Sequence, residues 1–254
     1  MSTPPALVAR GLVKRYGMIT AVADVDIEIG VGQVVAIVGD NGAGKSTLIK
    51  MLSGAVTPDS GELVVGGVPV KLSTPNDARH LGIETIYQDL ALLPNLDVTT
   101  NLYLGREETV ARPFGSLGIL ARRRMREEAK QHLSDLRIQL PRTWGTPVAS
   151  LSGGQRQSVA IARAMVWASR LVIMDEPTAA LGVAQSQAVL ELVRRVRERG
   201  TSVVIISHIL PHVLELADRI VVMRHGSKVA DMPSEGVSQD DLIELIVGFE
   251  RRSR

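Results

Sequence analysis

Short apolar runs rich in valine and isoleucine recur along this chain. They occupy residues 25–29, 34–38, 171–174, 203–206 and 220–223. We interpret these runs as continuous rather than alternating, a pattern that predicts strands buried on both faces of a sheet. Helical patterns lie between them, at residues 45–52, 153–167 and 183–199. Strands alternating with helices predict an α/β fold with a mostly parallel sheet and helices on both faces.

Two further segments depart from that rhythm. Residues 62–65 and 68–70 alternate between apolar and polar positions, and Gly66 and Gly67 join them. This pattern predicts an antiparallel hairpin. We therefore expect an antiparallel β part in the N-terminal region, beside the mostly parallel sheet.

Residues from about 90 to 150 lack a strand pattern and carry a loop with proline and glycine at 113–118. After this loop, one helical face collects Met125, Ala129, Leu133 and Leu136. We expect a helical subdomain at about 89–156, inserted into one domain that spans residues 1–254. The arginine-rich segment 122–126 could be a phosphate or lipid patch, but we interpret it as the solvated first turn of this amphipathic helix.

Composition narrows the classes of protein that fit. The chain has 254 residues, 45% hydrophobic and 22% charged, which is typical of a globular domain. Its net charge of +2 does not favour nucleic acid as the main partner. The absence of cysteine excludes thiol catalysis and cysteine-ligated metals. No apolar run approaches the ~18 residues of a membrane span, and the N-terminus lacks an apolar leader, so we expect a soluble cytoplasmic protein that contacts a membrane through a partner.

A glycine-rich segment follows the run at 34–38 and matches the phosphate-loop pattern G-x-x-x-x-G-K-[ST]. It consists of Gly39, Asp40, Asn41, Gly42, Ala43, Gly44, Lys45, Ser46 and Thr47. Gly42 and Gly44 allow backbone N–H groups to converge on phosphates, at the positive end of the next helix. Lys45 would neutralise the outer phosphates, and the Ser46 hydroxyl would bind Mg²⁺. The alternative is a glycine-rich turn with no ligand.

Two carboxylates follow the apolar run at 171–174. Asp175 and Glu176 would lie at the carboxyl edge of a parallel sheet, where such sheets bind ligands. Asp175 is placed to hold Mg²⁺, and Glu176 to orient or deprotonate an attacking water. Because acidic residues commonly end strands, this segment alone also fits a purely structural role.

The third motif is L-S-G-G-Q, at the start of the predicted helix 153–167. Its residues are Leu151, Ser152, Gly153, Gly154 and Gln155. Ser152 and Gln155 fit a capping box, which is a structural explanation. A cap does not require two successive glycines, each of which costs about 1 kcal/mol of helix propensity relative to alanine. Exposed N–H groups without side chains indicate an anion site.

In this order and spacing, the phosphate loop, L-S-G-G-Q and L-V-I-M-D-E resemble the nucleotide-binding subunits of ABC transporters, over about residues 7–249. The resemblance implies a P-loop NTPase fold and an ATPase with ATP and Mg²⁺ as cofactors. It implies that Tyr16 stacks on adenine, that Gln88 reaches the magnesium and the attacking water, and that His208 contacts the γ-phosphate. The other four histidines match no motif, and we interpret them as ordinary core or surface residues.

The resemblance also implies partners. Two copies would close head to tail, so that residues 151–155 of each complete the ATP site of the other. A membrane permease would dock around residues 88–101. Segments 83–107 and 174–183 resemble the ATPases of bacterial monosaccharide importers, which implies an indirect link to a sugar-binding protein and a place on the inner face of the membrane. Many such proteins fuse two ATPase domains where this chain has one, and Gly182 stands where the wider family has aspartate.

Other classes remain as alternatives. Chromosome-maintenance ATPases carry a long coiled coil between the two halves, and translation-associated relatives carry two such domains. This chain has neither. A catalytically weak regulatory subunit is disfavoured because Lys45, Asp175, Glu176 and His208 are all present. Within transporters, the ATPase of an exporter, or of an importer for another small solute, is the runner-up.

Overall fold

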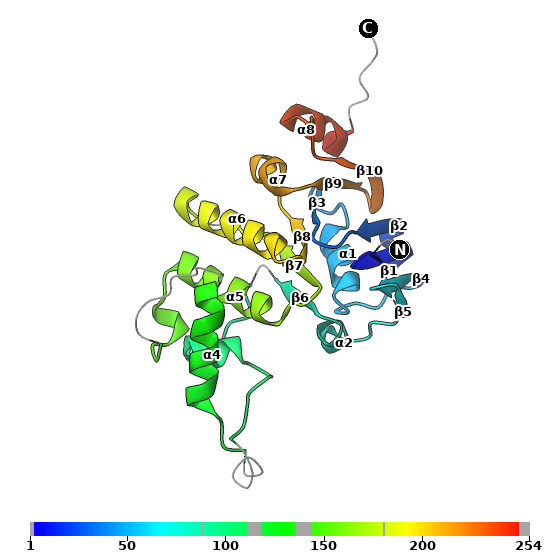
Figure 1. Ribbon diagram of the computed structural model, residues 1–254. Coiled ribbons are helices and arrows are strands. Elements are labelled where there is room, and N and C mark those ends of the chain that lie inside the picture. Colours follow the sequence, from blue (N-terminus) through cyan, green and yellow to red (C-terminus); the bar gives the residue numbers. More distant parts are fainter. Residues whose placement is uncertain (1–2, 88, 111–117, 136–143, 180, 249–254) are drawn as a thin grey trace. The chain divides into compact units, whose positions relative to one another are not determined.

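The computed structural model describes residues 3–87, 89–110, 118–135, 144–179 and 181–248. The chain forms two compact units. The first combines residues 1–88 with residues 168–254, and the second comprises residues 89–167. Figure 1 shows the elements of each unit along the chain.

A six-stranded sheet forms the centre of the first unit, in the order β10-β9-β3-β8-β7-β6. Its strands are β3 (Val34–Gly39), β6 (Ile83–Ile86), β7 (Leu171–Asp175), β8 (Ser202–Ile206), β9 (Arg219–Arg224) and β10 (Ser227–Pro233). All neighbouring pairs are parallel except β9 with β10. Four predicted apolar runs are confirmed as β3, β7, β8 and β9, and their central residues are buried as expected for strands covered on both faces.

A second sheet of four antiparallel strands has the order β2-β1-β4-β5. It consists of β1 (Leu7–Tyr16), β2 (Ile19–Ile29), β4 (Ser60–Val65) and β5 (Val68–Val70). The predicted hairpin is confirmed as β4 and β5. The prediction for residues 25–29 is wrong: Asp26 and Glu28 are exposed while Val25, Ile27 and Ile29 are buried, so only one face of β2 is covered.

The helices of the first unit are α1 (Lys45–Leu52), α2 (Pro75–His80), α6 (Val183–Glu198), α7 (Leu210–Leu216) and α8 (Gln239–Val247). The helices predicted at 45–52 and 183–199 are confirmed as α1 and α6, the latter one residue shorter. The apolar face of α1 includes Leu48 and Met51, which share one core with strands of both sheets. Helix α1, which follows the phosphate loop, is thereby fixed against both sheets.

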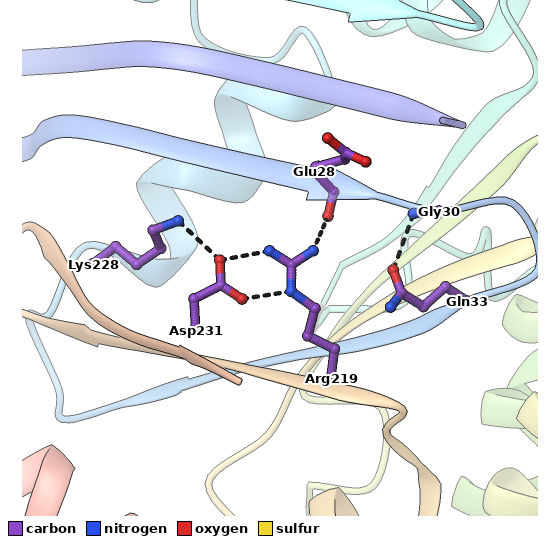
Figure 2. A network of polar contacts seen from close by, with 6 residues as sticks. All are labelled: Glu28, Gly30, Gln33, Arg219, Lys228 and Asp231. Atoms are coloured by element: carbon purple, nitrogen blue, oxygen red, sulfur yellow. Dashed lines mark hydrogen bonds and ion pairs between the residues drawn. The ribbon is translucent and has the colours of Figure 1, made fainter. Parts of the chain in front are cut away.

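Polar contacts also join the two sheets (Figure 2). Arg219 on β9 forms two hydrogen bonds with the Asp231 carboxylate on β10 and donates a third, of 2.7 Å, to the Glu28 carbonyl on β2. Lys228 donates to the same carboxylate at 2.8 Å. Burial alone would raise the pKa of Asp231, but the hydrogen bonds from Arg219 and Lys228 outweigh it and lower the pKa.

The regular elements described in the second unit are helical. It contains α3 (Val98–Leu102), α4 (Arg122–Asp135), a 3₁₀ turn at Val148–Ser150 and α5 (Gly153–Trp167). The predicted apolar face is confirmed for Met125, Ala129 and Leu133, which pack in one core with Tyr103, whereas Leu136 lies outside the described residues. The unit includes all of α5 because this helix packs on α3 through the same core. Every described helix of the chain is too short or too polar to span a bilayer.

Candidate nucleotide site

The phosphate loop joins β3 to α1 through a backbone that requires glycine. Gly42 and Gly44 have φ values of 80° and 97°, which L-residues rarely adopt. A Cβ atom at Gly44 would lie 2.3 Å from the carbonyl oxygen of Ala21, whereas the space at Gly42 is open. Gly44 is also the N-cap of α1 and offers no side-chain acceptor. The first N–H groups of α1 are therefore available to a phosphate.

Lys45 folds back over the loop. Only 9% of this residue is exposed, and its Nζ donates to the carbonyl oxygens of Gly39 and Asp40, at 2.8 Å each. Burial lowers the pKa of Lys45, and the carboxylates of Glu176, Asp40 and Asp175 partly oppose this shift. The two carbonyls hold the ammonium group beside the loop. The oxygens of a bound phosphate can replace these carbonyls as hydrogen-bond acceptors.

A hollow of about 300 Å³ connects the phosphate loop with Tyr16. Asn41 through Thr47 line one part of it, and Tyr16 at the end of β1 lines another. Tyr16 is 48% exposed, so its ring is accessible. Ile19, Thr20 and Ala21 also line this hollow, although no sequence motif indicates them. The turn at Gly17 could have indicated them, because a hairpin there places Ile19 opposite Tyr16.

Of the two predicted carboxylates, Asp175 is the last residue of β7 and Glu176 follows it. Burial, followed by repulsion from Glu176, raises the pKa of Asp175, while Lys45 and Lys50 lower it. Glu176 has a φ of 52°, an unusual value for a residue with a side chain. Its backbone N–H donates to the Ile206 carbonyl on β8 at 3.0 Å, which helps to hold this conformation.

His208 follows β8, the neighbour of β7 in the sheet. Its Nδ1 lies 2.7 Å from Oε2 of Glu176, and its side chain is 65% exposed. Because β8 lies between β3 and β7, the carboxyl ends of three parallel strands bring the phosphate loop, His208 and Glu176 to one edge of the sheet. A second contact supports this edge: Thr178 Oγ1 lies 3.3 Å from Nδ1 of His212, a histidine that we had interpreted as ordinary.

The donors for a metal ion at this edge are few and hard. Ser46 offers an exposed hydroxyl and Asp175 a carboxylate. Within the described part of the chain, no group of three or more histidine, cysteine or acidic side chains could hold a metal ion. Mg²⁺ is commonly bound by one or two protein ligands together with substrate phosphates, so this donor set fits Mg²⁺. Gln88, the third expected ligand, lies outside the described residues.

The L-S-G-G-Q segment lies in the second unit, at the start of α5. The backbone N–H of Ser152 donates to Oε1 of Gln155 at 2.9 Å, and the N–H of Gln155 donates to Ser152 Oγ at 3.3 Å. The predicted capping box is thus confirmed. Leu151 anchors the segment in the core, while Ser152 and Gly153 are exposed. A Cβ at Gly153 would meet nothing within 4 Å, so neither packing nor capping explains this glycine.

Gly182 is the N-cap of α6, with an extended backbone (φ −71°) and no side-chain capping bond. This conformation is open to any residue. Aspartate, which the wider family has here, is a favoured N-cap. The glycine therefore changes the side chain available at this position without changing the backbone that α6 requires.

Comparisons with known proteins find relatives of this chain in both sequence and structure. A family model described as "ABC transporter" matches residues 22–179. The chain is 46% identical to the fructose import ATP-binding protein FrcA of Rhizobium meliloti, covering 100% of this chain and 98% of that protein. It is 45% identical to the xylose/arabinose import ATP-binding protein XylG of Sulfolobus acidocaldarius, covering 94% and 93%. A crystal structure of the ADP conformation of an ATP-binding cassette of an ABC transporter superimposes with a TM-score of 0.79 at 28% identity, covering 96% of each chain.

Proposed function

Because the chain belongs to the ABC transporter family, we propose that it is the subunit that binds and hydrolyses ATP to drive uptake of a monosaccharide. One observation carries the ATPase part of this proposal. A single sheet edge holds a glycine-rich phosphate loop, a magnesium-type donor set and a carboxylate in hydrogen-bond contact with a histidine. Tyr16 lines the same hollow as the loop, which supports a nucleotide rather than a free phosphate as the ligand.

In this proposal the residues of the first unit divide the work of binding. Tyr16 stacks on the adenine, and the N–H groups of residues 41–45 cradle the phosphates. Lys45 moves from the loop carbonyls to the outer phosphates. Ser46 and Asp175 would hold Mg²⁺, which would supply positive charge to neutralise the nucleotide phosphates. Gln88 is proposed as a further ligand of the metal and of the attacking water.

Glu176 is the proposed base. His208 contacts Oε2, so Oε1 is the atom that we assign to the attacking water. The water oxygen bonds to the γ-phosphorus, the bond to the β–γ bridging oxygen breaks, and Glu176 accepts the water proton. His208 then holds the glutamate in place and offers its exposed ring to a γ-phosphate oxygen.

Residues 151–155 are proposed to complete the site of a second copy. Ser152, Gly153 and Gly154 would meet the ATP held by the partner's phosphate loop, with the exposed surface at Gly153 as support. Binding energy that favours the closed dimer would then shift the population of open and closed states. Membrane permease subunits would convert this shift into transport, with the chain bound at the inner face of the membrane and a sugar-binding protein linked indirectly.

The nature of the cargo rests on the relatives. The two reported relatives are named for fructose import and for xylose/arabinose import, and each is matched over nearly its whole length. A monosaccharide is the cargo class common to both. The sugar itself would be recognised by the other subunits.

Replacing Glu176 with glutamine tests the catalytic assignment. We expect ATP binding to persist and hydrolysis to fall by about 10²- to 10⁴-fold, because the amide cannot accept the water proton. Size-exclusion chromatography with ATP and Mg²⁺ should then show a stabilised dimer. Glu62→Gln on the exposed surface of β4 is the matched control. Unchanged hydrolysis in the Glu176→Gln protein would remove Glu176 from this role.

A further inference from the structure

Hydrogen bonds from the segment before β4 hold the end of β1, the strand that carries Tyr16. We call these contacts of Thr57 and Asp59 with residues 13–15 the latch. The register of β1 against β2 shifts between Lys14 and Arg15, and the pairing then continues to Tyr16 opposite Ile19. The N–H of Asp59 donates to the Val13 carbonyl at 2.8 Å, and the N–H of Arg15 donates to Oδ2 of Asp59 at 2.7 Å. Asp59, which precedes β4, thus binds the backbone on either side of Lys14.

The same latch fixes the Lys14 side chain. Its Nζ donates to Oδ1 of Asp59 at 2.7 Å and to the Thr57 carbonyl at 2.9 Å. Only 17% of this side chain is exposed, which is low for a lysine near the surface. Hydrogen bonds to a carboxylate and to a carbonyl fix the ammonium group in one place, whereas a freely solvated ammonium group would move.

Lys14 and Tyr16 lie two residues apart on one strand and therefore on the same side of it. The ammonium nitrogen of Lys14 lies 5.9 Å from the centroid of the Tyr16 ring, within the range of a cation–π contact. Tyr16 itself borders the hollow that leads to the phosphate loop. A cation beside the ring restricts its rotation and leaves ring surface free toward the hollow.

We infer that Lys14, held by Asp59, is a positioning residue for the nucleobase: it orients the Tyr16 ring so that the open ring surface faces the base. The inference rests on the proposed function, since it needs a base on Tyr16. Tyr16 lines the hollow that leads to the phosphate loop, and Lys14 is not among the described residues that line it. Its effect therefore belongs to the affinity for the base and not to the bond-breaking step.

Calorimetric titration of the full chain with two probes tests this inference. The probes are ATP and inorganic tripolyphosphate, each with Mg²⁺. For Lys14→Met, which keeps the aliphatic stem without the charge, we expect ATP affinity to fall by about 2- to 5-fold, the range of an exposed cation–π contact. Tripolyphosphate affinity should not change. Lys14→Arg keeps a cation and should retain ATP affinity. Asp59→Asn keeps an acceptor for Arg15, and it should lower the affinity for ATP but not the affinity for tripolyphosphate.

Tyr16→Leu tests the stacking of the base on Tyr16 separately from the role of Lys14. This variant should have a lower affinity for ATP but an unchanged affinity for tripolyphosphate. Adding Lys14→Met to Tyr16→Leu should cause no further loss of ATP affinity. If Tyr16→Leu weakens ATP and Lys14→Met does not, the role of Lys14 is overturned and the base stack stands. If Tyr16→Leu has no effect, the base stack is overturned and the inference with it. Equal losses for both probes would make Lys14 a general structural residue and would also overturn it.

Discussion

Gly44 shows how one residue can serve two sheets at once. Its positive φ turns the loop into α1, and its missing side chain allows the Ala21 carbonyl of β2 to approach. Gly42 shares the positive φ but has open space around it. A side chain at Gly42 would therefore meet backbone strain alone, whereas a side chain at Gly44 would meet both strain and a steric clash.

Alanine at each position should reveal this difference. Gly42→Ala should cost about 1–2 kcal/mol of unfolding free energy, the strain of a left-handed residue. Gly44→Ala should cost more, because its Cβ must also displace the Ala21 carbonyl, and the movement should distort the nucleotide hollow. Urea denaturation gives the two free energies, and ATP titration gives the effect on the hollow. Equal costs for the two variants would contradict the contact with β2.

At the level of elements, the sequence predicts helices of two or more turns, uninterrupted apolar runs and the hairpin at Gly66 and Gly67, but it does not predict α2 or β6. The patterns of α1, α5 and α6 span two or more turns, and β3, β7, β8 and β9 are uninterrupted apolar runs. Helix α2 has six residues and β6 has four, too few to establish a period. Residues 25–29 resemble the buried runs in their valine and isoleucine content, but their alternation with Asp26 and Glu28 is typical of a strand with one exposed face.

The candidate site divides in the same way. Local sequence motifs identify the phosphate loop, Asp175 and the capping box, because each of these depends on the spacing of residues close together in the chain. The contact of Glu176 with His208 depends on β7 and β8 being neighbours, which local spacing does not show. The contacts of Asp59 with Lys14 and Arg15 join segments about 45 residues apart, and only the pairing of β1 with β4 brings them together.

Helix α5 offers a test that separates capping from nucleotide contact at Ser152. Ser152→Ala removes the capping oxygen and should lower the unfolding free energy by about 1 kcal/mol. Ser152→Asp restores an N-cap and favours the positive end of the helix, so its stability should match the original protein. Its negative charge should nevertheless repel the phosphates of the partner's ATP. We expect urea denaturation to distinguish the two variants and ATP-dependent dimerisation to be lost in Ser152→Asp. A dimer of unchanged stability in Ser152→Asp would contradict the contact across the dimer.

On the scale of the whole chain, segments distant in sequence must be held together within the first unit. Arg219 links β9 to the Glu28 carbonyl of β2, across 191 positions of sequence, and Asp231 fixes Arg219 from β10 (Figure 2). The Asp231 side chain is only 16% exposed, so water competes weakly for these contacts. Because β2 borders the nucleotide hollow and β3 precedes the phosphate loop, the two walls of the hollow depend on the joint between their sheets.

Asp231→Asn should weaken this joint in a manner that depends on pH. The folded protein lowers the pKa of Asp231, so the unfolded chain binds the proton more tightly. The stabilisation is complete above the ordinary carboxyl pKa of about 3.9 and is lost as the pH falls from there through the lower folded value. Between about pH 5 and pH 7 we expect a constant loss of about 2 kcal/mol in the variant, since Arg219 and Lys228 keep charges without their partner. As the pH falls from about 4 through the lower folded pKa, the difference in unfolding free energy between the variant and the original protein should shrink.

Urea denaturation at several pH values measures this difference. Glu62→Gln is the matched control, because Glu62 pairs with Arg10 at 3.1 Å while more than half of each side chain is exposed. Solvent screens such a pair, so its loss should change the unfolding free energy by less than about 0.5 kcal/mol. If the two variants behaved alike, the Asp231 network would be an ordinary surface pair, and the apolar core around α1 would be left as the main connection between the sheets.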